Sequence, residues 1–150
     1  MLPKITAIDR ADEDVRAKVV GPLAEANTRR DFAFSTHFLT FALIDEIGVE
    51  GGLLAQFYWD WLHIEVVAVP VRWRGLGLGR QLVERAEAAA IEAACIGVWV
   101  DTYSFQAPEF YEAIGYTPFG RLPNYPKGHE RIFYQKILRP GPPDKPENAA

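Results

Sequence analysis

Three glycines at alternate positions, Gly75, Gly77 and Gly79, lie between Arg74 and Arg80 in the stretch RGLGLGR. An apolar, strand-like stretch precedes them and a helix-like pattern follows. Glycines let the backbone approach a ligand with no side chain in between. The start of a helix adds unpaired N–H groups and the positive end of the helix dipole. The loop therefore predicts a binding site for an anion, and a phosphorylated ligand is the expected occupant.

Two common phosphate-binding loops differ from this one. A nucleoside-triphosphate loop carries a lysine and a hydroxyl residue after its last glycine, whereas Arg80 and Gln81 follow Gly79. A dinucleotide loop reads G-x-G-x-x-G and opens the first helix of its fold. Here Arg80 stands at the third glycine position, in the middle of the chain. A nucleotide-dependent oxidoreductase is therefore the weaker alternative.

A third pattern, R-x-x-G-x-G, is met by Arg74, Gly77 and Gly79. With it the sequence resembles the GNAT superfamily of N-acetyltransferases, whose acyl-CoA pyrophosphate is held by such a loop. The downstream segment EFYEAIGY (109–116) is similar to the FYEKLGF segment of that fold, and YPKGH (125–129) is similar to the YPPGH of a bacterial subgroup. The resemblance covers nearly all of residues 4–138. It implies N-acetyl transfer from acetyl-CoA to a primary amine of a small molecule or peptide, by direct attack in a ternary complex.

The resemblance also implies how acetyl-CoA is held. The strand ending at Val69 is expected to bulge and to part from the strand 97–102, so that the pantetheine arm lies in the opening like an extra strand. Ser104 stands where many family members carry an asparagine that contacts this arm. The implied cofactor contacts are Val67, Ala68, Val69, Arg74, Gly75, Leu76, Gly77, Leu78, Gly79, Arg80, Ser104 and Tyr111.

Acetyl transfer to an amine needs a general base for the amine proton and an acid for the departing thiolate. Glu65 is predicted as the base because it lies four residues before Val69, sharing a strand face with His63 and Val67 if the strand is regular. Asp101 and His129 are the alternative bases. Tyr111 matches the family tyrosine that stands near the CoA sulfur, so it is the predicted acid.

The acceptor pocket is expected to be rich in aromatic side chains. Such a wall suits an amine with apolar or ring character, through stacking or cation–π contacts. The predicted acceptor contacts are Trp59, Trp61, Asp101, Tyr125 and His129. The three histidines show no metal-ligand spacing, so we expect no metal site.

Periodicity predicts the elements that position these residues. A strand is expected at 4–8, followed by a helix over 11–30 with a break or kink at Gly21–Pro22. Three strands are expected within 36–70, a four-turn helix from Gly79, a strand at 95–102, a short helix at 107–115 and strands at 116–121 and 130–138. The predicted fold class is α+β, with the mixed, splayed sheet of the GNAT acyltransferases flanked by helices. We expect a single domain over 1–139 and a disordered, proline-rich tail over 140–150.

Composition sets the remaining expectations for this chain of 150 residues. The net charge of −4 shows no excess of basic residues of the kind that binds nucleic acid. A single cysteine excludes an internal disulfide, and no apolar leader or membrane span is evident. We therefore expect a cytoplasmic protein without nucleic-acid or membrane partners, and the family resemblance favours a homodimer. A non-catalytic acyl-CoA sensor remains the alternative to an enzyme.

Overall fold

The computed structural model describes residues 1–139, so the predicted tail at 140–150 lies outside the described residues. The chain divides into two compact units, Met1–Phe34 and a larger unit from Ser35 onward. The first unit contains one helix, and the second contains the whole β-sheet. No helix within the described range combines the length and the apolar character that a bilayer span requires.

The first unit differs from the sequence prediction at two points. Residues 4–8 form no strand, because they pair with no neighbouring strand and an isolated strand leaves its N–H and C=O groups unpaired. Helix α1 (Glu13–Arg29) is continuous where a break was predicted. Pro22 removes a single hydrogen bond from the helix ladder, and the helix continues beyond it. The side chain of Asp12 caps this helix by accepting from the N–H of Val15 at 2.9 Å.

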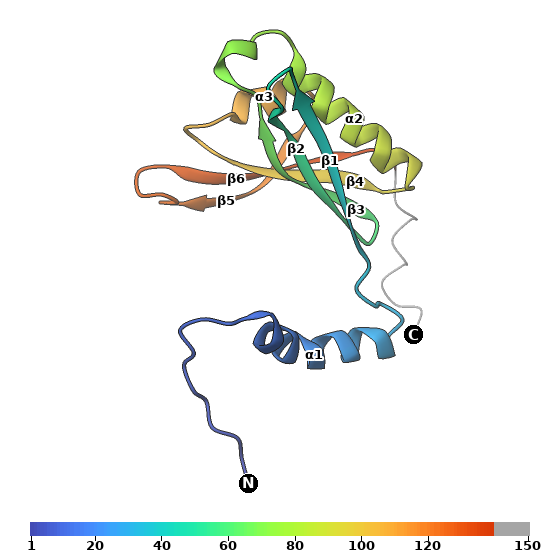
Figure 1. Ribbon diagram of the computed structural model, residues 1–150, viewed down its shortest axis with the longest axis vertical. Helices are drawn as coiled ribbons and strands as arrows, with labels where there is room; N and C mark the ends of the chain where they lie inside the picture. The colour runs from blue at the N-terminus through green and yellow to red at the C-terminus, as the bar shows by residue number, and fades with distance from the viewer. Residues whose placement is uncertain (140–150) are drawn as a thin grey trace, which may run out of the picture. The chain divides into compact units, whose positions relative to one another are not determined.

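The second unit is built on a mixed six-stranded sheet, which confirms the predicted fold class (Figure 1). Its strands run in the spatial order β1-β2-β3-β4-β6-β5, and only β3 and β4 pair in parallel. The strands are β1 (Thr36–Ile44), β2 (Val49–Tyr58), β3 (Trp61–Ala68), β4 (Gly97–Tyr103), β5 (Thr117–Pro123) and β6 (Glu130–Ile137).

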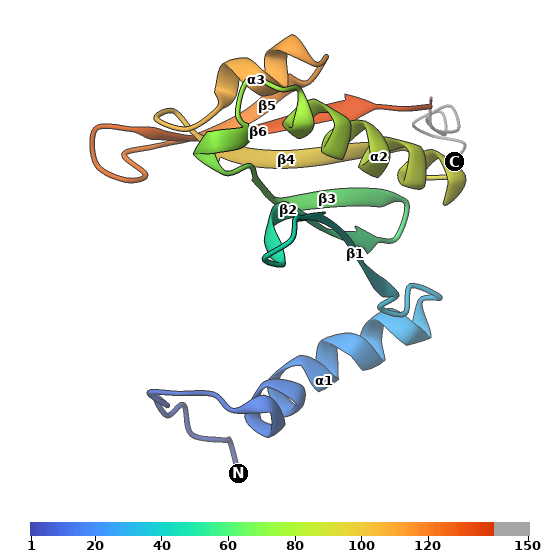
Figure 2. The ribbon, with the colours of Figure 1, turned by 45° about the horizontal axis from the view of Figure 1, so that its top comes forward.

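Helix α2 (Leu78–Glu92) connects β3 to β4 and lies across the sheet (Figure 2). Its buried stripe packs against the central strands, as the helical spacing of its apolar residues predicts. That stripe consists of Leu82, Val83, Ala86 and Ala90. The short helix α3 (Pro108–Ala113) adds Tyr111 to the same core, so both helices share one apolar core with the sheet.

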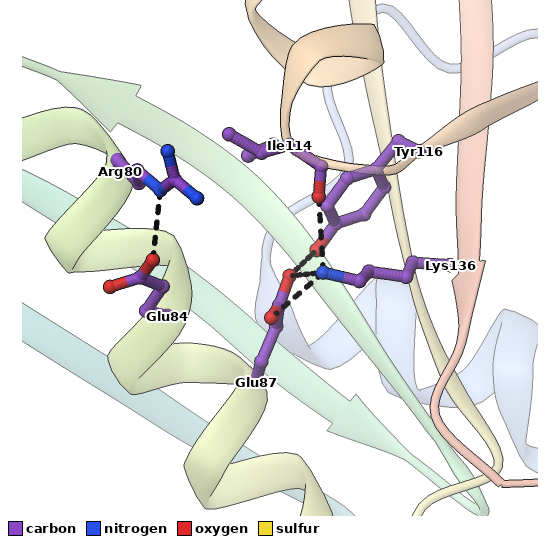
Figure 3. Close-up of polar contacts among 6 residues, drawn as sticks. All are labelled: Arg80, Glu84, Glu87, Ile114, Tyr116 and Lys136. Carbon is purple, nitrogen blue, oxygen red and sulfur yellow. Dashed lines mark hydrogen bonds and ion pairs between the residues drawn. The ribbon is translucent and has the colours of Figure 1, made fainter.

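A polar cluster ties α2 to β6 and to the residues that follow α3 (Figure 3). The Nζ of Lys136 donates to both carboxylate oxygens of Glu87, at 3.1 and 3.2 Å, and to the carbonyl of Ile114 at 3.0 Å. The hydroxyl of Tyr116 donates to Glu87 at 3.0 Å. Burial, followed by the charge of Glu87, raises the pKa of Tyr116 far above its usual value, so this donor keeps its proton.

This cluster predicts a strong dependence of stability on Glu87 and a weak one on Glu84, one turn away. The side chain of Glu87 is 14% exposed, whereas Glu84 and its partner Arg80 are 57% and 65% exposed. We expect Glu87→Gln to lower the free energy of unfolding by about 1–3 kcal/mol, since Lys136 loses the opposite charge of its partner and one of the two carboxylate oxygens that accept from it. The matched control Glu84→Gln changes it by less than about 0.5 kcal/mol.

Urea unfolding of the two variants measures both values. Equal losses in the two variants would show that the cluster in Figure 3 contributes no more than a surface ion pair.

Candidate active site

The parallel pairing of β3 and β4 ends halfway along the strands. It runs from Trp61 opposite Gly97 to Ile64 opposite Val100 and goes no further. Beyond these pairs, the edge of β3 that faces β4 has no strand partner in the described structure. This confirms the predicted parting of the two strands, and it leaves backbone donors and acceptors available to a ligand in the opening.

A β-bulge lies at the point where the strands part. Leu54 of β2 pairs with Val66, but the next residue, Ala55, pairs with Ile64, so Glu65 is the extra residue. The bulge agrees with the one expected in this strand, and it means that Glu65 does not share a face with His63 and Val67 as it would in a regular strand. Val67 packs against the core together with Ile64, while Glu65 is exposed.

The glycine loop follows the end of β3 through a short 3₁₀ turn, Val71–Trp73. Gly75 and Gly77 both adopt a left-handed φ of 78°, and Gly77 begins α2 with no side-chain cap. Within residues 1–139, the backbone N–H groups of residues 75–80 donate to no protein acceptor. Unpaired N–H groups at the positive end of the α2 dipole are the features that the predicted anion site requires.

The two arginines of the loop have different partners. The Nε of Arg74 donates to the carbonyl of Val69 at 3.1 Å, which fixes the loop to the end of β3. Arg80 forms an exposed pair with Glu84 at 2.9 Å, one turn along α2. Arg74 therefore braces the loop, and both guanidinium groups add positive charge beside the free N–H groups.

The opening between the strands is continuous with the loop and forms a cavity of about 1050 Å³. Most of the predicted site residues line it. They are Glu65, Val67, Ala68, Val69, Arg74, Gly75, Gly77, Leu78, Gly79, Arg80, Asp101 and Tyr111.

Tyr111 enters the cavity from α3 on the core face of the sheet. Its ring packs between Tyr116 and Tyr134, and the residue is 6% exposed. Burial, with a smaller contribution from the charge of Asp101, raises the pKa of Tyr111 to about 12. Tyr111 therefore stays protonated over the whole physiological range and is able to donate its proton.

Asp101 lies on β4 directly after the last β3–β4 pair, on the other face of the sheet from the buried Val100. One carboxylate oxygen accepts from the Nε of Arg131 at 2.6 Å. The other lies 3.6 Å from the Nε2 of His63, which is longer than a hydrogen bond, and the His63 ring stacks on Trp99. Burial raises the pKa of Asp101, but the combined effect of His63 and Arg131 is greater, so its pKa is lowered. Asp101 is therefore a fixed negative charge at the apex of the opening.

Six predicted contacts lie outside the cavity lining: Leu76, Ser104, Trp59, Trp61, Tyr125 and His129. The Ser104 hydroxyl accepts from the N–H of Glu130 at 3.0 Å and thus contacts the start of β6. Trp61 lines a second, smaller hollow of about 430 Å³ together with Trp99 and Phe133. Because Trp59 and Trp61 lie at the start of β3, away from the opening, the predicted acceptor wall is corrected at these two positions.

The sequence prediction missed several residues of the cavity, above all Tyr103, Phe105 and Arg131. The alternation of β4 places Tyr103 on the face of Asp101, which was a usable signal. Arg131 comes from β6 and becomes visible only through the register that places it opposite Tyr103. Among residues 1–139, no three His, Cys, Asp or Glu side chains gather as a metal site.

Comparison with known proteins agrees with this geometry. The model of the acetyltransferase (GNAT) family matches residues 8–116. The blasticidin-S acetyltransferase of Streptomyces morookaense is 37% identical over 129 residues, which cover 85% of this chain and 90% of that protein.

Solved structures agree as well. An acetyltransferase from Bacillus cereus superimposes with a TM-score of 0.77 at 28% identity, covering 89% of this chain and 98% of its own. A more distant structure from Bacillus anthracis, in complex with acetyl coenzyme A, has a TM-score of 0.60 at 21% identity. It covers 67% of this chain and 62% of its own.

The chain therefore belongs to the GNAT acetyltransferase family and has the fold of that family. It is an acyltransferase, since its relatives are acetyltransferases over almost their whole length. This finding supports the enzyme prediction over that of a non-catalytic sensor.

The loop geometry predicts that Gly77→Ala weakens CoA binding. A β-carbon at a left-handed φ costs about 1–2 kcal/mol, and relief of this strain turns the loop N–H groups away from the diphosphate. We expect the dissociation constant for CoA, measured by isothermal titration calorimetry, to rise at least about fivefold.

Gly128 provides the matched control. It has a φ of 83°, also has open space around it, and lies in the β5–β6 connection. Gly128→Ala is expected to lower the free energy of unfolding by about as much as Gly77→Ala does, and to leave the dissociation constant for CoA unchanged. If both variants bound CoA as the unmodified protein does, the loop would not be the diphosphate site.

Proposed function

We propose that this protein transfers the acetyl group of acetyl-CoA to a primary amine of a small molecule by direct attack in a ternary complex. The observation that carries the proposal is the free N–H groups of residues 75–80, which lie next to the unpaired edge of β3. Together they offer one continuous backbone surface for a diphosphate and an extended arm.

The chemistry of this surface fits acetyl-CoA. The diphosphate accepts hydrogen bonds from the loop, and Arg74 and Arg80 add positive charge. The pantetheine amides pair with the backbone of residues 67–69 in the opening. In the proposed complex the thioester lies at the apex, between Tyr111 and Asp101, and the proposal is supported by the fact that both residues line the cavity.

The two faces of the sheet have different roles in the proposed reaction. The acceptor amine approaches on the face of Asp101, whose charge is paired with Arg131, and the exposed carboxylate of Glu65 attracts its cation. Tyr111, on the core face, donates its proton to the departing thiolate. The amine proton passes to a general base. Glu65 is the proposed base because its carboxylate is exposed within the cavity and forms no ion pair with any side chain of residues 1–139.

The proposed acceptor is a small-molecule amine. The similarity to blasticidin-S acetyltransferase supports a small molecule rather than a peptide. The net charge of −4 mildly favours a cationic amine. A homodimer and a cytoplasmic location remain predictions from the sequence.

The direct test is a thiol-release screen of the purified protein with acetyl-CoA and a panel of small amines, with acetylated products identified by mass spectrometry. Acetyl-CoA-dependent product with at least one amine supports the proposal. The absence of CoA binding at millimolar concentration in isothermal titration calorimetry would refute it.

Tyr111→Phe is expected to lower kcat by about 10²-fold, because the thiolate loses its proton donor. CoA affinity should stay the same, since the phenol holds no backbone group of the loop. Tyr116→Phe is the matched control, because that ring packs against Tyr111 but its hydroxyl donates to Glu87 outside the cavity. A similar kcat in the two variants would remove the acid role from Tyr111.

Glu65→Gln and Asp101→Asn separate the general base from the fixed charge. Loss of the base lowers kcat by about 10²-fold and removes the acidic limb of the pH–rate profile, which we expect for Glu65→Gln. Asp101→Asn leaves Arg131 unpaired, so we expect mainly a higher KM for the amine. The assignment reverses if Asp101→Asn alone removes the acidic limb.

A further inference from the structure

Aromatic side chains gather where the cavity opens beside Asp101. We call Tyr103, Phe105, Tyr125 and Arg131 the aromatic rim. Tyr103, Phe105 and Arg131 line the cavity, and Tyr125 adjoins them. These residues come from β4, from the loop after it, and from the β5–β6 connection with the start of β6, so three separate parts of the chain meet there.

The rings of the rim are held in a defined arrangement. Tyr103 and Phe105 stack with centroids 5.5 Å apart and an interplanar angle of 13°. Tyr125 meets Tyr103 edge to face at 5.6 Å, and His129 supports Phe105 in the same way at 5.0 Å. Such contacts preorganise a surface, because few rotamers remain to be fixed when a ligand binds.

Arg131 adds a further flat group to this surface. Its guanidinium carbon lies 5.7 Å from the Tyr103 ring and 5.3 Å from the Tyr125 ring. Its Nε donates to Asp101 at 2.6 Å, and its Nη1 donates to the Tyr125 hydroxyl at 3.2 Å. These hydrogen bonds lock the plane of the guanidinium group and neutralise Asp101, so Arg131 acts at the rim as a stacking surface more than as a free charge.

The rings are nevertheless exposed. Phe105 is 55% exposed and Tyr125 is 42% exposed, although both belong to this ordered cluster. Exposed apolar surface at the mouth of a cavity is a common sign of a binding site. The cavity continues from the rim to Tyr111, so a molecule resting on the rim reaches the position where the amine must react.

We propose that the aromatic rim binds a planar, unsaturated ring that the acceptor carries next to its reactive amine. This inference rests on the proposed function and adds the class of acceptor. Parallel aromatic faces and a locked guanidinium plane match the flat face of such a ring, and the carboxylate of Glu65 matches its ammonium group. An aliphatic amine offers the charge without the flat face.

The test compares amines that differ only in the saturation of the ring. Benzylamine and cyclohexylmethylamine form one pair, and phenethylamine and cyclohexylethylamine form a second. With acetyl-CoA in excess, we expect kcat/KM from thiol release to be about three- to tenfold higher for the unsaturated member of each pair, mainly through KM. Equal values within both pairs would overturn the inference.

Variants locate the effect on the rim. Phe105→Leu and Tyr125→Leu remove a flat face but keep apolar volume. The ratio of kcat/KM for the unsaturated amine to kcat/KM for its saturated partner should therefore fall towards one. Tyr125→Phe keeps the ring and should keep the preference. Phe119→Leu is the matched control, because Phe119 is 52% exposed on β5 and lies outside the cavity. An unchanged preference in Phe105→Leu and Tyr125→Leu would also overturn the inference.

A binding measurement separates this inference from the proposed function. Saturation-transfer NMR with the full chain and CoA should show contact with the ring protons of benzylamine, and Phe105→Leu should lose the contact. Ring contact without acetylation of any amine would support the rim and contradict the proposed function. Acetylation without ring contact, and with equal kcat/KM within the pairs, would support the proposed function and contradict the role of the rim.

Discussion

The separation of β3 from β4 beyond Ile64 and Val100 is the constraint on which the candidate site depends. A parallel pair that continued its hydrogen bonds would fill the space that the cavity occupies. The bulge at Glu65 re-aims β3 at this point, and antiparallel pairing with β2 continues on its other edge. The chain therefore opens the sheet on one edge of β3 without losing the support of its neighbour.

The opening becomes a site because other parts of the fold hold their groups beside it. Arg74 fixes the glycine loop to the end of β3, and the Glu87 cluster joins α2 to the residues that follow Tyr111. The helix that presents the loop and the helix that presents the tyrosine are thus linked through a half-buried polar network. On the other face, Arg131 joins β6 to Asp101 of β4.

The sequence predicted those parts of the site that are formed by residues close together along the chain. The glycine spacing predicted the turn and the free N–H groups, and the segment 107–115 predicted a short helix that carries Tyr111. Trp59 and Trp61, two of the five predicted acceptor contacts, lie outside the cavity, because Trp61 and Glu65 are close in sequence but are separated by about 13 Å along an extended strand. Arg131, from a distant strand, needed the sheet register. The strand predicted at 4–8 had a local pattern but lacks a partner.

The uncapped start of α2 has a consequence for the protein before any chemistry occurs. No group of the described residues accepts from the N–H groups of residues 75–80, and on the proposed function the diphosphate of the donor would accept from them only when the chain is folded. Folding and the supply of the acyl donor are therefore thermodynamically linked. At a donor concentration one hundred times its dissociation constant, this linkage amounts to about 2.7 kcal/mol. Resistance of the protein to heat and proteolysis would thus vary with the metabolic state that sets the level of that donor.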